Sequence, residues 1–355
     1  MDYRSPSFFH STVSTARHKW LSRLALFATL LAFCVILKGA YTRLVDAGLG
    51  CPDWPGCYGF LSVPNESHEI ALAEARFPDA PVEVHKGWPE MIHRYMASTL
   101  GLAILALAWI SWRSPPSPSL PRKHALALVG LVVLQGLFGM WTVTLKLWPQ
   151  VVTAHLLGGM MTLALLSLLV MRLKTSRQLV SLDVLSQTRR LRLWTFAAVV
   201  ALVIQIFLGG WVTSNYAALA CPDFPTCQTQ WWPEMDFKTG FNFFQEVGPN
   251  YLGGLMHNEA RVAIHMAHRM GAVCVTLLIV VSLWKLWGLS ELLKIRQGLV
   301  LAGLLLLLQI GLGLTNVLAL LPLPVAVAHN GVAALLLLSL VWLNYRLFTL
   351  KGTQS

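Results

Sequence analysis

Four histidines inside apolar stretches of the sequence are the residues whose type and spacing most clearly suggest chemistry. They form two pairs, one in each half of the chain: His93 with His155, and His268 with His329. A single buried histidine usually does no more than bond to a neighbouring helix, but two imidazoles on facing helices can hold an iron porphyrin by both axial positions. Zinc is disfavoured because no third nitrogen or thiolate ligand accompanies either pair. The pattern predicts two haem sites, one in each half.

Prolines suggest how deep three of these histidines lie. Pro89, Pro149 and Pro324 precede the next histidine by four, six and five residues. Because proline is favoured at the start of a helix, we expect each of the three helices to begin there. At the helical rise, these intervals correspond to about 6–9 Å. The histidines are therefore expected just beneath one surface of the membrane.

A carboxylate beside one histidine distinguishes the two halves. Glu90 precedes His93 by three residues, so both side chains project from one helix face, whereas His265 stands at the matching place before His268. A carboxylate there can take up protons or stabilise positive charge; alternatively, it only complements the helix dipole. The asymmetry predicts a substrate site in the N-terminal half and a permanent haem in the C-terminal half. His265 is an alternative to His268 as the iron ligand.

An arginine follows the first histidine of each pair. Arg94 directly follows His93, and Arg269 directly follows His268. Either arginine can extend its charge toward the lipid headgroups, or it can make a charge-assisted contact with a haem propionate.

Four cysteines form two short, similar motifs. Cys51 and Cys57 bracket CPDWPGC, and Cys221 and Cys227 bracket CPDFPTC. Outside a bacterial inner membrane the compartment is oxidising, so a disulfide is expected in each motif. A structural role is the default, and a redox role is the alternative because exposed loop disulfides are the more easily reduced ones.

The chain that must position these residues is unusually apolar. Of its 355 residues, 55% are hydrophobic and 12% are charged, against about 25% charged in an average soluble domain. A secreted enzyme, a nucleic-acid-binding domain and a disordered scaffold are excluded, because none of them keeps so much apolar surface out of water. The fold class predicted is an all-α integral membrane protein with eight transmembrane helices. These spans are read at 21–40, 90–112, 124–145, 151–172, 193–213, 261–284, 298–321 and 325–345.

The distribution of charge indicates the topology. If the N-terminus is cytoplasmic, 18 of the 27 basic residues but only 3 of the 16 acidic residues fall on the cytoplasmic side. The positive-inside rule then places both termini in the cytoplasm and the histidines near the periplasmic face of a bacterial inner membrane. The net charge of +11 thus reflects topology and contact with the lipid bilayer, not nucleic acid. A cleaved signal peptide at 21–40 is disfavoured because no small-residue cleavage site follows.

Self-comparison divides the chain into two halves. ILKGAYTRLVDAGLGCPDWPGC returns 170 residues later as IFLGGWVTSNYAALACPDFPTC, EMIHRYM returns 175 residues later as HMAHRMG, and VVTAHLL returns 174 residues later as VAVAHNG. Four spans per half make a parallel repeat, two tandem four-helix bundles related by a pseudo-twofold axis along the membrane normal. The predicted parts are a cytoplasmic tail (1–20), a first half (21–172, with outer loop 41–89), a cytoplasmic linker (173–192), a second half (193–345, with outer loop 214–260) and a second cytoplasmic tail (346–355).

Taken together, these motifs resemble the haem A synthase family. The resemblance rests on the duplicated eight-span plan, the loop TRLVDAGLGCPDWPGC, the EMIHR and HMAHR blocks and the two late histidines, and it covers about 21–346. Members of this family oxidise a ring methyl of haem O to the formyl group of haem A by successive hydroxylations. Water supplies the oxygen, and a bound haem b transfers electrons. The resemblance implies partners in cytochrome oxidase biogenesis: haem O as substrate, haem A as product, haem O synthase, a quinone or other membrane electron acceptor, and a second copy of the chain.

The resemblance also implies roles for individual residues. His93 and His155 correspond to the ligands of the substrate haem, and His268 and His329 to the ligands of haem b. Glu90 matches the essential acid of the family. The pair Cys51 and Cys57 matches the family's outer-loop pair, whereas the pair Cys221 and Cys227 is not universal in the family.

Two other classes of protein fit parts of the pattern. A di-haem b electron-transfer subunit linked to quinone would use both histidine pairs equally, and the difference between Glu90 and His265 argues against it. A haem transporter also suits a parallel repeat, but it needs a polar path to the cytoplasmic side that the inner ends of the spans do not provide. The pigments extracted from the purified protein distinguish these classes.

Overall fold

The computed structural model describes residues 7–114, 122–174, 178–246, 248–291 and 293–353, with side chains from residue 17 onward. Within these ranges the chain is helical apart from its loops and one pair of very short strands. The helices are α1 Ser7–Leu44, α2 Ser67–Arg76, α3 Val84–Arg113, α4 Arg122–Thr144, α5 Pro149–Lys174, α6 Leu182–Ser214, α7 Phe237–Gly240, α8 Asn258–Trp287, α9 Arg296–Leu318 and α10 Leu323–Phe348; the strands are β1 Leu179–Val180 and β2 Lys351–Gly352.

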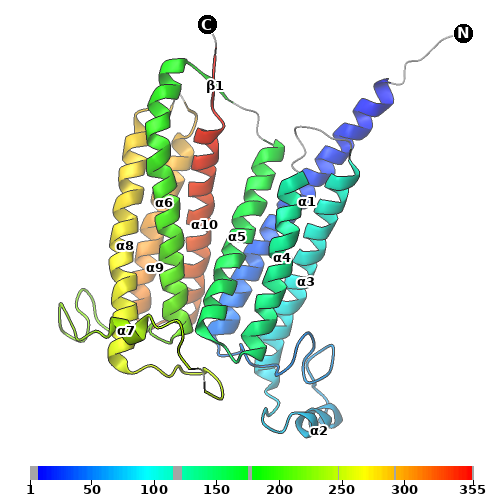
Figure 1. Cartoon of the computed structure of the whole chain (residues 1–355), viewed down its shortest axis with the longest axis vertical. Helices are drawn as coiled ribbons and strands as arrows, with labels where there is room; N and C mark the ends of the chain where they lie inside the picture. The colour runs from blue at the N-terminus through cyan, green and yellow to red at the C-terminus, as the bar shows by residue number, and fades with distance from the viewer. Residues whose placement is uncertain (1–6, 115–121, 175–177, 247, 292, 354–355) are drawn as a thin grey trace, which may run out of the picture.

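Eight of the helices in the described part of the chain are long and apolar enough to cross a membrane: α1 (from Arg17), α3, α4, α5, α6, α8, α9 and α10. The prediction of eight membrane spans is thereby confirmed. Figure 1 shows α1, α3, α4 and α5 as one group and α6, α8, α9 and α10 as a second group beside it. The helices α2 and α7 lie at one end of the bundle, which we call the loop end; β1, β2 and the first turns of α1 lie at the other end, which we call the tail end.

Several helices begin before the predicted spans do, and α6 is one of them. Helix α6 begins at Leu182, within the predicted linker 173–192, and not at residue 193. Ser181 caps the helix by accepting a hydrogen bond from the Val184 N–H at 3.4 Å, and Asp183 lies in the first turn. Both features favour a helix start. An apolar run marks only the part of a helix that lipid surrounds, so the polar first turns of α6 were not predicted to be part of the helix.

The prediction that Pro89 starts a helix is wrong. Helix α3 begins at Val84, so Pro89 lies inside it, whereas Pro149 is the first residue of α5 and Pro324 lies in the first turn of α10. Packing of the loop after α1 extends α3 past Pro89 toward the N-terminus of the helix. A Cβ added at Gly50 of this loop would lie 2.5 Å from the backbone of the α3 residue Lys86. The contact with the loop thus offsets the hydrogen bond that proline cannot make.

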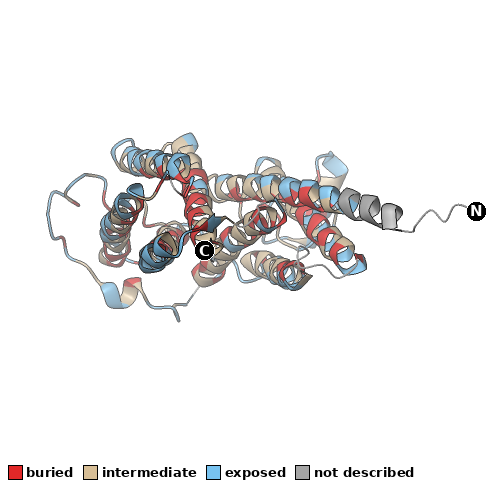
Figure 2. Ribbon diagram, turned by 90° about the horizontal axis from the view of Figure 1, so that it is seen from above, coloured by how far each residue is buried: buried red, intermediate tan, exposed pale blue. Residues whose placement is uncertain are grey.

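The core lies where α1, α5, α6 and α10 face one another between the two groups of helices. Each of these helices packs against at least two of the others. Small buried side chains, including Ala28, Ala32, Ala198 and Ala334, allow the helix backbones to approach closely. Figure 2, a view down the helices, shows the buried residues concentrated on the inward faces of these helices.

Polar and close contacts join the two groups along the seam between α5 and α6. The hydroxyl oxygens of Thr153 and Ser214 lie 2.9 Å apart in a buried position. One turn away, a Cβ added at Gly210 would lie 2.9 Å from Leu156 Cδ2. At the loop end, Tyr251 N–H donates to the Lys146 carbonyl at 3.0 Å.

A two-stranded parallel sheet closes the tail end. Leu179 pairs with Lys351 and Val180 pairs with Gly352, so the connection before α6 is tied to the segment after α10. This pairing could not be predicted, because strands of two residues are too short to show an alternating pattern.

Replacing Gly210 by valine is expected to weaken the seam between the two groups of helices. The added methyl groups must displace Leu156 and Thr153, whose nearest atoms would lie 2.9 and 3.2 Å from a new Cβ. Overpacking of this kind costs about 1–3 kcal/mol, so the thermal unfolding midpoint in detergent should fall. Gly130→Val is the matched control, since nothing lies within 4 Å of a Cβ at Gly130; equal midpoints for the two variants would contradict the close seam.

Candidate functional site

A cavity of about 460 Å³ lies among α1, α3, α4 and α5, with α6 and α10 adding to its wall. Its volume is within the range of about 300–1,000 Å³ that small-molecule and cofactor sites have. The wall is mainly apolar, and its ionisable residues are Arg43, Glu90, His93, Arg94 and His155. The structure thus brings four of the residues predicted from the sequence to one cavity and adds Arg43.

His93 on α3 and His155 on α5 face each other across this cavity. Their ring centres lie 6.4 Å apart and the ring planes are inclined by 83°. A metal–imidazole bond is about 2 Å long and the ring centre lies roughly 1 Å behind the nitrogen, so two axial imidazoles on one metal have centres about 6 Å apart. The Nδ1 atoms of both rings are buried without a hydrogen-bond partner. The pair therefore fits an iron porphyrin held by two imidazoles.

A glycine on a neighbouring helix packs against each of these rings. A Cβ added at Gly39 of α1 would lie 2.9 Å from His93 Cε1, and one at Gly139 of α4 would lie 3.5 Å from His155 Cε1. A side chain at Gly39 would thus push the imidazole of His93 from its position. Glycine is required there because the ring approaches the helix backbone.

The second group of helices carries the same arrangement around His268 on α8 and His329 on α10. A Cβ added at Gly209 of α6 would lie 3.1 Å from His268 Cε1, and one at Gly313 of α9 would lie 3.3 Å from His329 Cε1. Each of the four histidines thus has its ring against a glycine of another helix. This second pair offers the same donor set as the first, two imidazoles on separate helices.

Glutamine amides contact the imidazoles of the second pair. Gln205 Nε2 lies 3.0 Å from His268 Nδ1, and Gln309 Nε2 lies 3.2 Å from His329 Nε2. Among the described residues, the Nδ1 atom of His329 has no hydrogen-bond partner, as at His93 and His155, so His268 is the member of the four whose Nδ1 has one. His265, the alternative ligand, has its Nδ1 within 2.9 Å of the Ala217 carbonyl oxygen. That contact occupies one ring nitrogen of His265.

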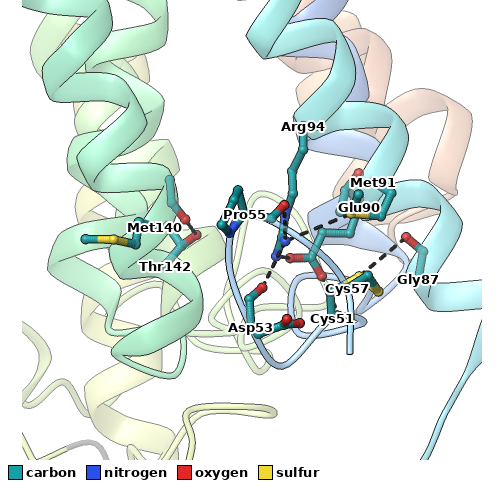
Figure 3. A network of polar contacts seen from close by, with 12 residues as sticks. Cys51, Asp53, Pro55, Cys57, Gly87, Glu90, Met91, Arg94, Met140 and Thr142 are labelled. Atoms are coloured by element: carbon teal, nitrogen blue, oxygen red, sulfur yellow. Dashed lines mark hydrogen bonds and ion pairs between the residues drawn. A yellow bond between two sulfur atoms is a disulfide. The ribbon is translucent and has the colours of Figure 1, made fainter. Parts of the chain in front are cut away.

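Glu90 is held in place by the disulfide loop and by Arg94. Its side chain is buried, and its Oε2 accepts the Cys51 N–H at 3.0 Å while its Oε1 pairs with Arg94. Arg94 also donates to the carbonyl oxygens of Asp53, at 2.9 Å, and of Gly56. Figure 3 shows this network at the turn that the loop makes over α3. The carboxylate of Glu90 therefore has a fixed position in the wall of the cavity.

Arg269 makes the corresponding contacts in the second half. It donates to the carbonyl oxygens of Cys221, Asp223 and Thr226 at 2.8–2.9 Å. Arg94 and Arg269 thus both bind backbone carbonyls of the disulfide loops. Contact of either arginine with a propionate stays a prediction.

Both predicted cysteine pairs are disulfides, Cys51–Cys57 and Cys221–Cys227. An aspartate stabilises each loop from within. Asp53 accepts the backbone N–H groups of Tyr58, at 2.6 Å, and Gly59, at 2.8 Å. Asp223 does the same for the two residues after Cys227. The sequence analysis missed this role, although the CPD motif in both halves was a signal for it.

Arg43 is the functional candidate that the sequence analysis overlooked. It lies in the last turn of α1, lines the cavity and reaches the second half, where its Nη1 donates to the Tyr216 hydroxyl at 2.9 Å. A signal was available in the repeat, since threonine, Thr213, replaces this arginine in the second copy.

These features define a class of protein: a multi-pass membrane protein with paired histidines in a cavity enclosed by its helices. The family model of the cytochrome oxidase assembly proteins, COX15-CtaA, matches residues 22–341. The chain belongs to this family.

Several individual proteins are similar to the chain over much of its length. A haem A synthase of Shewanella oneidensis is 46% identical over 336 residues, which cover 95% of this chain and 98% of the relative. Haem A synthases of Chelativorans sp. and Rhizorhabdus wittichii are 28% and 26% identical, and the similarity covers 77% and 92% of this chain and 75% and 94% of those proteins. The similarity to the first and last of these relatives extends through both groups of helices.

The loop closed by Cys221 and Cys227 should lose order in acid. Hydrogen bonds from the Thr226 hydroxyl and from the N–H groups of Thr229 and Gln228 hold the pKa of the Asp223 carboxyl below its usual value. A lowered pKa in the folded state gives stability that is present above about pH 4 and is lost as the pH falls through the folded pKa.

Hydrogen exchange of the Gln228 and Thr229 amides, corrected for intrinsic rates, measures this effect. Protection should fall as the pH drops below about 4. In Asp223→Asn the protection should be lower at neutral pH and independent of pH in this range. A wild-type loop with constant protection from pH 7 to pH 3 would contradict the role of the carboxylate.

Proposed function

We propose that this protein is a haem A synthase, an oxidoreductase that converts haem O to haem A by oxidising a ring methyl to a formyl group. Membership of the family and the 46% identity to a haem A synthase support this reaction. The structural observation that carries it is the cavity in which His93, His155 and Glu90 come together. It combines two axial ligands with a buried carboxylate.

The substrate haem O is assigned to this first cavity. His93 and His155 hold its iron, and their ring separation of 6.4 Å suits that role. The apolar wall excludes water from the macrocycle and suits its hydrocarbon substituents. The residues that hold haem b are assigned to the second half: His268 and His329 are the ligands, with the amides of Gln205 and Gln309 beside them.

The reaction requires the removal of electrons and protons from one carbon. Each of two hydroxylations removes two electrons and one proton from the methyl carbon, while the attacking water provides the oxygen and releases the second proton. The geminal diol formed by the second step then loses water to leave the formyl group. Haem b, bound by His268 and His329, supplies an acceptor for single electrons. A quinone or another membrane acceptor receives them in turn.

Glu90 is the residue to which we assign the acid–base and electrostatic role. Removal of electrons from the methyl group leaves positive charge on the carbon, which a nearby carboxylate stabilises. The same carboxylate can accept a proton from the attacking water. The Cys51 N–H and Arg94 keep Glu90 oriented. In the second half His265, in contact with the Ala217 carbonyl, occupies the matching place.

The topology proposed for this function places both termini in the cytoplasm and the loop end in the periplasm. The distribution of basic residues supports it. The two halves, 21–172 and 193–345, are proposed to be a parallel repeat, and the matched glycine–histidine contacts in both halves support this relation. Haem O synthase as the supplier of substrate and a second copy of the chain remain proposed partners.

Separate loss of the two pigments is expected when the two histidine pairs are changed. His93→Ala should yield protein that retains haem b but lacks haem O and haem A, because one axial ligand of the substrate is gone. His268→Ala should lower the haem b content. Extraction of the pigments from purified protein and chromatography check this result. Haem b alone in the wild type, at two per chain, would instead identify a di-haem electron carrier.

Charge at Glu90 is expected to be necessary for the reaction. Glu90→Gln retains the size of the side chain and an acceptor for the Cys51 N–H, but it removes the negative charge. Acid–base and electrostatic groups each contribute roughly 100-fold or more to rate, so haem A formation from haem O should fall by about that factor. Glu83→Gln is the control, because Glu83 is on the surface beside Lys86. Equal haem A yield from both variants would remove Glu90 from the mechanism.

A further inference from the structure

Arg43 occupies a distinctive position at the loop end of α1. It follows Gly39, the glycine that packs against His93, by four residues and therefore lies on the same face of α1, one turn or about 6 Å further along. Its side chain lines the cavity and is 13% exposed. The guanidinium thus stands beside the cavity, about one turn beyond the imidazole pair.

The hydrogen-bonding capacity of Arg43 is only partly used. Nη2 donates to the Thr213 carbonyl at 3.0 Å, and Nη1 donates to the Tyr216 hydroxyl, whose ring lies under the guanidinium at 4.1 Å. Nε is buried and, among the described residues, has no hydrogen-bond partner. A guanidinium has five N–H donors, so donors remain for a further acceptor.

The charge of Arg43 is poorly compensated. Its carboxylate partner, Asp46, lies at 3.5 Å with a side chain 59% exposed, so water screens this pair. Arg94, the other arginine in the cavity wall, is already paired with the buried Glu90 and bound to loop carbonyls. A guanidinium whose charge is only partly compensated raises the free energy of the folded protein when it lies in an apolar wall, unless an anion binds to it.

We propose that Arg43 binds a propionate carboxylate of the substrate haem, an inference that rests on the proposed function. A carboxylate is the group that a guanidinium recognises best, and the propionates are the anionic substituents of an otherwise largely apolar macrocycle. With the iron between His93 and His155, the contact directs the propionate edge toward the loop end. Thr213 stands at the matching position of the second half, so this contact belongs to the substrate site alone.

The test compares two forms of the substrate on two forms of the protein. Protein is purified from a host without haem O synthase, and haem O or its propionate dimethyl ester is added in detergent while the Soret band is followed. Wild type should bind the free acid about tenfold or more tightly than the diester, since a charge-assisted hydrogen bond is lost on esterification. In Arg43→Gln the affinity for the acid should fall close to that for the ester.

Two further variants sharpen the comparison. Arg43→Lys keeps the charge and should restore part of the preference for the acid, whereas Arg23→Gln, at an exposed position 20 residues earlier on α1, should leave the preference unchanged. Equal affinities of wild type for acid and ester, or an unchanged preference in Arg43→Gln, would overturn the proposal. The comparison on wild type needs no variant, so equal affinities for acid and ester overturn the proposal even if a variant fails to fold, while a preference for the acid is assigned to Arg43 by the loss in Arg43→Gln.

Failure of the proposed function gives a different result. If wild type does not bind haem O at all, or if His93→Ala binds it as well as wild type, the substrate site itself is misassigned. Haem b absorbance, recorded in every sample, verifies that the second half is intact.

Discussion

The close contact between imidazole rings and glycine backbones is the constraint on which the rest of the structure depends. Gly39 and Gly209 bring neighbouring helices within van der Waals reach of His93 and His268, and a side chain at either glycine would displace the ring. Iron ligation tolerates little displacement, because the two ligand bonds fix the separation of the rings. Helix packing thereby sets the positions of the histidines at the two proposed haem sites, and the seam joins the two groups of helices that carry them.

Polar groups reach this apolar core from the loop end. The disulfide loop of the first half lies on α3 because Arg94 binds its carbonyls, and the same loop donates the Cys51 N–H to Glu90. The carboxylate is therefore positioned by a covalently closed loop and by the helix that carries His93. Arg43 adds a second charged side chain, which lines the cavity and also donates a hydrogen bond to Tyr216 of the second half. The proposed binding of the substrate, the orientation of Glu90 and the contact between the two groups of helices thus all involve the loop end of the first group.

The membrane spans and both disulfides were predicted from the sequence, because an apolar run or a pair of nearby cysteines can be recognised within one short segment. Prediction from the sequence failed at Pro89, where packing of the loop against α3 outweighs the helix-starting preference of proline. It also overlooked Arg43 and the loop-closing role of Asp223, whose partners lie on other segments or on the backbone. Contacts between distant segments leave no periodic signal, so only the structure reveals them.

Electron paramagnetic resonance of the oxidised protein, loaded with substrate, tests the central constraint most directly. Gly39→Val should alter or abolish the low-spin signal of the haem in the first half and leave that of the second half unchanged. Gly209→Val should have the opposite effect, because a side chain there would meet the His268 ring. Spectra of both variants identical to that of the wild type would contradict the account, since the rings would then be positioned independently of the glycines behind them.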